Sequence, residues 1–91
     1  MMKYSVGDLV FIKHYKHKPR VPFRINARYS FGQLLRHELF NSYGIVTQAI
    51  NHNDAWEGQS TNRDNVYIWF SQIDGKQYFF CENEVTGEVI E

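Results

Sequence analysis

The residues best suited to chemistry are a histidine pair and one cysteine. His14 and His17 stand three positions apart, but a zinc site normally adds a second close pair of ligands, and the lysines beside these histidines would repel a divalent cation. Cys81 lies in an apolar run, where burial keeps a thiol protonated and inert. No nucleophile elbow, phosphate-binding loop or H-E-x-x-H spacing is present. We therefore expect no metal site, no cofactor and no enzymatic activity.

The charges are sorted along the chain. Residues 1–50 carry eight lysines and arginines against two acids, and residues 51–91 carry two against eight, so halves of +6 and −6 cancel to a net charge of +0. Seven of the ten basic residues lie in one stretch: Lys13, Lys16, Lys18, Arg20, Arg24, Arg28 and Arg36. This distribution predicts a local basic surface for an acidic partner, or opposite poles that pair with one another.

Length and composition indicate one small globular domain, residues 1–91. The chain is 43% hydrophobic and 16% aromatic, which is far from the composition of disordered proteins. Its apolar runs are much shorter than the ~20 residues that span a bilayer, and no signal peptide is recognisable at its start. The lone Cys81 cannot form an internal disulfide, which suits the cytoplasm.

Period-two patterns and turn residues predict five strands. They cover residues 6–13, residues 43–50, the two arms of a hairpin within residues 66–81, and residues 87–90, while residues 51–65 are expected to form a long polar loop. A basic insertion, residues 14–41, follows the first strand and should end in one short helix over residues 31–40. Ser30 and Gln33 have the spacing of a capping box for that helix.

Asp74-Gly75 predicts a two-residue hairpin turn. Phe70 would then lie opposite Phe79 on one face of the hairpin, and Trp69 opposite Phe80 on the other. We assign the Phe70 face to the core. The Trp69 face, which also carries Tyr67, would then need a cover, either the helix over residues 31–40 or a partner protein.

These segments resemble the skeleton of small SH3-like barrels, of KOW or Tudor type, which are common in tailed-phage genomes. The motifs that carry the resemblance are Gly7-Asp8-Leu9-Val10, Gly44-Ile45-Val46, Val66-Tyr67-Ile68-Trp69-Phe70, Tyr78, and Glu84-Val85 before Gly87-Glu88-Val89-Ile90. The resemblance covers residues 6–13 and 43–91. It implies a mainly β fold, a small five-stranded barrel, and a phage-type accessory protein in the host cytoplasm. Because the fold carries many functions, the resemblance does not assign one.

Three functions fit these observations. The first is a protein-interaction module that binds an acidic host or virion protein through its basic insertion and aromatic face. Its expected contact residues are Lys13, Lys16, Lys18, Arg20, Arg24, Arg28, Arg36, Trp56, Tyr67 and Trp69, with Trp56 and Trp69 exposed. The second is a nucleic-acid-binding barrel in which the basic loop follows phosphates. The third is a virion protein that assembles with its own copies, basic half to acidic half.

Overall fold

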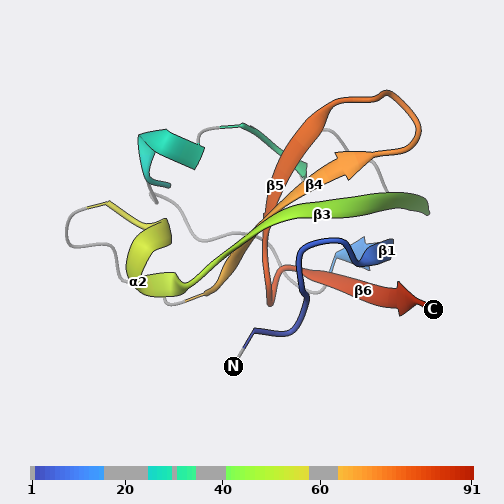
Figure 1. Cartoon of the computed structure of the whole chain (residues 1–91), viewed down its shortest axis with the longest axis horizontal. Helices are drawn as coiled ribbons and strands as arrows, with labels where there is room; N and C mark the ends of the chain where they lie inside the picture. Colours follow the sequence, from blue (N-terminus) through green and yellow to red (C-terminus); the bar gives the residue numbers. More distant parts are fainter. Residues whose placement is uncertain (1, 16–24, 30, 35–40, 58–63) are drawn as a thin grey trace.

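One mixed β-sheet of six strands forms most of the structure, a computed structural model that describes residues 2–15, 25–29, 31–34, 41–57 and 64–91 (Figure 1). The strands are β1 (Leu9–Tyr15), β2 (Gly32–Gln33), β3 (Ser42–Ile50), β4 (Val66–Ser71), β5 (Gln77–Cys81) and β6 (Val85–Ile90). Their order in the sheet is β2-β5-β4-β3-β1-β6. The predicted mainly β class is confirmed, but the sheet has six strands and is not a closed barrel, because β2 and β6 lie at its two ends.

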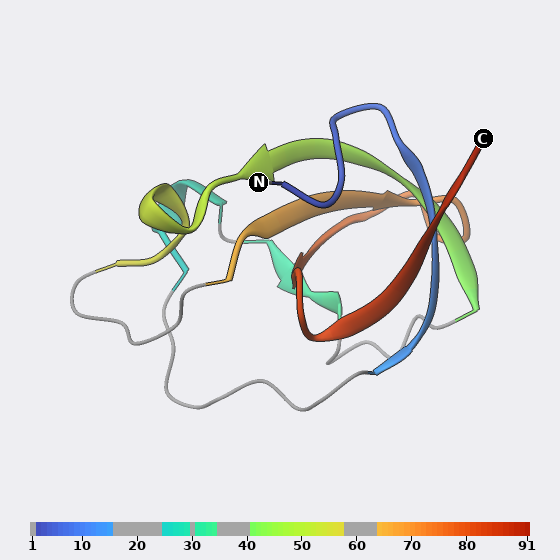
Figure 2. The same ribbon diagram turned by 90° about the horizontal axis from the view of Figure 1, so that it is seen from below.

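The central strands form where β-branched and aromatic residues are concentrated. β3, β4 and β5 follow one another as antiparallel neighbours, and β1 inserts between β3 and β6 with antiparallel pairing on both sides. The sheet is strongly twisted, so β1 and β6 cross the other strands at a steep angle (Figure 2). β6 begins at Val85, two residues earlier than predicted.

The register of the β4–β5 hairpin differs from the prediction by two residues. Phe70 lies opposite Gln77, and Trp69 lies opposite Tyr78. The amide of Ser71 donates to the carbonyl of Lys76, so the connection is a four-residue loop, residues 72–75. Within it the amide of Gly75 donates to the carbonyl of Ser71, and Gly75 has a φ of 67°. Asp74-Gly75 therefore ends a longer turn instead of forming the whole of a two-residue one.

The helix predicted over residues 31–40 is wrong at its start. Gly32 and Gln33 form β2, which runs parallel to β5 with Gly32 beside Tyr78. Glycine is a poor helix former, and a free sheet edge offers its backbone hydrogen bonds. Leu34 follows and is fully buried; Ser30 and residues 35–40 lie outside the described residues.

The long loop predicted over residues 51–65 contains a short helix, α2 (His52–Ala55), just beyond the end of β3 (Figure 1). The side chain of Asn51 caps it by accepting a hydrogen bond from the amide of Asn53 at 2.9 Å. One turn of 3-10 helix, η1 (Ala27–Tyr29), precedes β2 in the chain. It is distant from α2 in the sequence but close to it in space. The backbone of Asn26 donates to the carbonyl of Ala55 at 2.7 Å, which ties the two segments together.

The inner side of the curved sheet holds the larger of two hydrophobic clusters. We call it the inner cluster; it comprises Tyr4, Val10, Ile12, Leu34, Val46, Tyr67, Trp69, Tyr78, Phe80 and Val85. Trp69 is its largest side chain and has no exposed surface. Its indole lies directly over Gly44, where a side-chain carbon would collide with the ring, and its Nε1–H donates to the carbonyl of Val10 at 3.2 Å. One side chain thus joins β4, β3 and β1.

A second cluster lies on the opposite, outer side of the sheet. It comprises Ile50, Ala55, Trp56, Val66, Ile68, Phe79 and Cys81, with Ile25 and Tyr29 partly buried against it. The prediction that the Phe70 face forms the core is therefore right for Ile68, Phe79 and Cys81. It is wrong for Phe70, which lies beyond the second cluster and is 38% exposed.

Replacing Gly44 with alanine should overfill the inner cluster. The added methyl group meets the Trp69 indole in a fully buried setting, and overpacking of this kind costs about 1–3 kcal/mol of unfolding free energy. Urea unfolding measures the loss. Gly75→Asn is the control, since no atom lies within 4 Å of a Cβ there and asparagine tolerates a positive φ. A Gly44→Ala protein as stable as the parent would contradict the placement of the indole.

Candidate functional site

Of the basic residues predicted to bind a partner, the structure describes two. Lys13 on β1 forms an ion pair with Glu88 on β6, with 3.0 Å between Nζ and the carboxylate. Arg28 lies exposed on η1. The other five, Lys16, Lys18, Arg20, Arg24 and Arg36, lie outside the described residues, so their assembly into one basic surface stays a prediction.

The aromatic residues predicted to contact a partner are buried. Trp69 and Tyr67 have no exposed surface and belong to the inner cluster. Their expected exposure is wrong, because Tyr4 of the N-terminal segment and Val10 and Ile12 of β1 pack in the same cluster. Leu34, from the segment that was predicted to cover this face, packs there as well. A role for these side chains in holding the fold follows directly from their burial.

Trp56 is also buried, with 9% of its surface exposed. Its Nε1–H donates to the carbonyl of Asp64, eight residues further along the chain, at 2.9 Å. Its backbone forms a bridge with Ile25. Its predicted exposure as a contact residue is therefore wrong. It anchors the second cluster on the outer side of the sheet.

The strand register brings six apolar residues together on the part of the outer side that the second cluster leaves open. Residues opposite one another on neighbouring strands share a face of the sheet. Ile90, Leu9, Ile45 and Phe70 form one such row across β6, β1, β3 and β4. Phe11 and Tyr43 form a second row beside it. We call these six residues the outer apolar face.

The outer apolar face is accessible to a partner. Tyr43 is 47% exposed, and Ile45, Phe70 and Ile90 are each close to 40%. The rings of Phe11 and Tyr43 pack with centroids 4.7 Å apart, so part of the face is already ordered. Ile68 and Val66 lie on the same side of β4 as Phe70, and both are buried in the second cluster. The apolar outer side of the sheet is therefore covered by that cluster at one end and exposed at the other.

A polar network fixes the N-terminal segment across the end of β4. The Tyr67 hydroxyl accepts from the amide of Lys3 at 2.9 Å and donates to the Glu82 carboxylate at 2.7 Å. Glu82 also accepts from the amide of Lys3 and from the Asn65 side chain. Burial, and then the hydrogen bond to Glu82, raise the pKa of Tyr67 to about 12. These bonds hold Tyr4 in the inner cluster.

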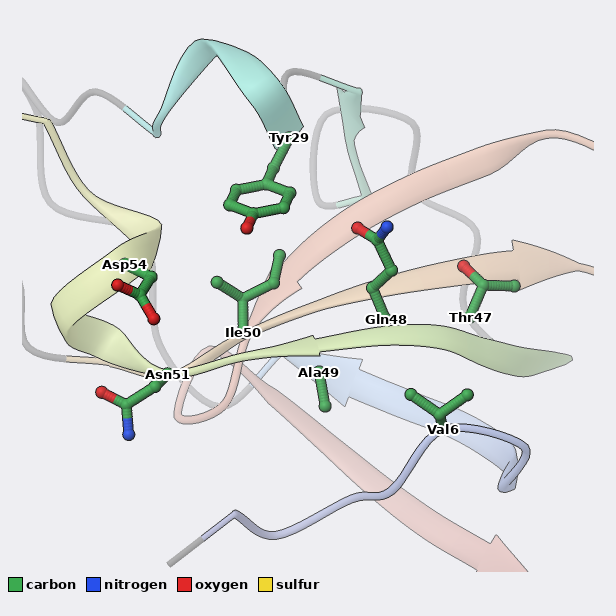
Figure 3. A pocket seen from close by; sticks show the side chains of 8 residues that line it. All are labelled: Val6, Tyr29, Thr47, Gln48, Ala49, Ile50, Asn51 and Asp54. Carbon is green, nitrogen blue, oxygen red and sulfur yellow. The ribbon is translucent and has the colours of Figure 1, made fainter.

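A cavity of about 380 Å³ opens beside the last residues of β3 (Figure 3). Its lining residues lie on both sides of that strand, with Tyr29 and Gln48 on one side and Val6 on the other. Asp54 is the one charged residue among the described residues of the lining. Tyr29 and Thr47 add hydroxyl groups to the described lining, and no histidine, cysteine, lysine or arginine lines it with them.

Cys81 is the one cysteine of the chain, and it is buried. Burial, with Glu84 as the next cause, raises the pKa of the Cys81 thiol well above its usual range, which leaves it protonated. No group of three histidine, cysteine or acidic side chains in the described part of the chain could hold a metal ion. Within the same residues, no helix is long and apolar enough to cross a membrane.

Comparisons with protein families, with characterised proteins and with solved structures found no match for this chain. The candidate site therefore depends on the geometry of the chain itself. The outer apolar face was missed at the level of the sequence, although its signal is present. Leu9 and Phe11 alternate with Val10 and Ile12, so both faces of β1 are apolar, and Tyr43 and Ile45 stand at the same period of two on β3.

Replacing Tyr67 with phenylalanine should loosen the N-terminal segment. The variant leaves the Lys3 amide and the Glu82 carboxylate without their shared hydroxyl, at a cost of about 1–3 kcal/mol. It should also reduce the pH dependence of stability. As the pH rises from 10 to about 12, the unfolded chain releases the Tyr67 proton while the folded chain retains it, so the unfolding free energy falls. Urea unfolding across this pH range measures both effects.

The control is Tyr43→Phe, which removes the hydroxyl of an exposed tyrosine. It should cost little stability, because the side chain of Tyr43 is already 47% exposed. If Tyr67→Phe kept the full decline of stability above pH 10, the assignment of that proton to Tyr67 would be wrong.

Proposed function

We propose that this chain is a protein-interaction module that docks its partner on the outer apolar face. The observation that carries the proposal is the contiguity of Leu9, Phe11, Tyr43, Ile45, Phe70 and Ile90 across four strands. Single exposed apolar residues are ordinary, but a contiguous exposed apolar surface marks an interaction site. The partner that fits is a protein with an apolar recess.

The composition of the face suits binding. Tyr43 and Phe70 supply aromatic area, which dominates the energetics of protein interfaces. Their backbones belong to central strands, so little conformational entropy is lost when a partner orders them. At the rim, the Lys13–Glu88 ion pair provides polar groups of both signs, which can orient a partner without committing the surface to one charge.

We also propose that the sheet is of the SH3-like type, as the sequence motifs suggested. The order β5-β4-β3-β1-β6, with three consecutive antiparallel strands and the first long strand placed beside the last, supports this proposal. β2 is an addition at the far edge. A phage origin and a host or virion partner remain part of the proposal and rest on the resemblance alone.

Binding to nucleic acid is the alternative that the basic stretch raises. The described residues do not favour it, since Lys13 is engaged by Glu88 and the outer apolar face carries no cation. A phosphate-binding surface would gather cations with high exposure. Nuclease treatment separates the two functions in one experiment.

Introducing a charge at Ile45 should abolish docking. Ile45→Asp places a carboxylate at the middle of the outer apolar face, where a bound partner would exclude water from it, and should weaken binding by at least tenfold, about 1.4 kcal/mol. The measurement is affinity capture from nuclease-treated lysate, followed by titration of the captured protein, once purified, against each variant.

The matched control is Ile73→Asp, because Ile73 is an exposed isoleucine on the β4–β5 loop and is not one of the six residues of the outer apolar face. It should bind as the parent does. Equal binding by Ile45→Asp and Ile73→Asp would overturn the proposed surface. Capture that disappears with nuclease would overturn the protein partner in favour of nucleic acid.

A further inference from the structure

β6 is the last strand of the sheet and has an open edge. β1 pairs with one side of it from Val85 to Ile90, and no described strand pairs with the other side. Such an edge presents a row of backbone donors and acceptors that another strand can complete. The edge is six residues long, which is enough for a regular ladder.

The hydrogen bonds show which residues of β6 face outward. Val46 donates to the carbonyl of Asp8 and accepts from the amide of Gly7, so on β3 alternate residues direct their backbone groups toward β1. Gly44 is one of them, so the backbone N–H and C=O groups of its partner Val10 point toward β3. The backbone groups of the residues on either side of Val10 point toward β6 instead.

The same alternation continues onto β6. The backbone groups of Leu9 and Phe11 point toward β6, so those of their partners Ile90 and Glu88 point back toward β1. Gly87 and Val89 then direct their N–H and C=O groups outward. Val85 follows the same alternation, two residues before Gly87.

The devices that usually protect an edge strand are weak here. Protective edges carry proline, lysine, a bulge in the edge strand or an unpaired charge. β6 has the sequence Val-Thr-Gly-Glu-Val-Ile, with neither proline nor lysine. Its one charged residue, Glu88, is neutralised by Lys13 at 3.0 Å.

We propose that β6 pairs with β6 of a second copy of this chain, antiparallel, about a two-fold axis at Gly87. In this register Gly87 lies opposite the partner copy's Gly87, Val85 lies opposite Val89, and the outward backbone groups of all three meet one another. Thr86 lies opposite Glu88, so no carboxylate faces another. A register centred on Glu88 would pair as many residues of β6 but would set Glu88 opposite Glu88 of the second copy. Registers centred on any other residue of the strand pair fewer.

The electrostatics of the chain favour a second copy over an unrelated strand. The net charge is +0, so no long-range repulsion keeps two copies apart. β6 belongs to the acidic half of the chain, but its Glu88 is paired with Lys13 of the same copy. A two-fold axis also makes the contact closed, which gives dimers and not fibres. The pairing goes beyond the proposed function, because it leaves the outer apolar faces of both copies exposed on a continuous sheet and makes the module bivalent.

Sedimentation equilibrium of the purified chain, from micromolar to millimolar concentration, tests the pairing. We expect a reversible monomer–dimer equilibrium. Val89→Pro removes one outward N–H and leaves the inward ladder to β1 intact, so it should shift the chain to monomer. Val89→Thr keeps that N–H and should dimerise as the parent does. A parent that is monomeric throughout, or a dimer that persists in Val89→Pro, would overturn the proposal.

A second pair of variants tests the register without altering the backbone, and so covers the case in which Val89→Pro fails to fold. Thr86→Lys places a cation opposite the partner copy's Glu88, and Thr86→Glu places a carboxylate there. Cross-strand charge pairs differ enough that the two dissociation constants should differ by roughly tenfold, with Thr86→Lys the tighter. Equal constants would overturn this register.

The outcome is separable from that of the proposed function. A monomeric chain that still loses its partner in Ile45→Asp would remove the dimer and leave the outer apolar face as a docking surface. A dimer that Ile45→Asp disrupts and Val89→Pro does not would show self-association through the face, and would overturn the edge pairing.

Discussion

The contact between the Trp69 indole and Gly44 determines which side of the sheet is the inside. The ring fills the space that a side chain at position 44 would occupy, and its N–H satisfies the carbonyl of Val10. β4, β3 and β1 are thereby held with one set of side chains inward. Because successive residues alternate between faces, the inward position of Trp69 obliges Ile68 and Phe70 to point outward. The apolar outer side is a geometric consequence of the packed inner side.

That outer side is only partly covered from within. α2 and Trp56 bury Ile68 and its neighbours, and they end before Phe70. The sheet is thus apolar on both faces, as buried sheets are, yet one part of its outer face remains in contact with water. A surface of this kind is costly for a monomer unless something binds it. The proposed docking function follows from this imbalance and needs no catalytic group.

Local patterns in the sequence identify the strands but not their partners. The segments that became β1, β3, β4 and β5 were recognisable from period two and from β-branched residues. The hairpin register was missed because Asp74-Gly75 can end a four-residue loop as readily as it forms a two-residue one. The burial of both tryptophans was missed because it depends on segments that are distant in the sequence. Trp69 is buried by the N-terminal segment and β1, and Trp56 is buried beside Ile25. The outer apolar face required the register of four strands, which no local pattern contains.

The most direct test of the account is whether the outer apolar face is open to solvent in the isolated chain. Isoleucine methyl groups report this in one spectrum, by their relaxation in the presence of a soluble paramagnetic probe. Ile12 and Ile68 have no exposed surface, Ile73 is highly exposed, and Ile45 lies on the face. We predict that the Ile45 methyl signals broaden strongly, as those of Ile73 do, while Ile12 and Ile68 stay sharp. Protection of Ile45 equal to that of Ile68 would mean that the chain covers its own outer face, and would contradict the account.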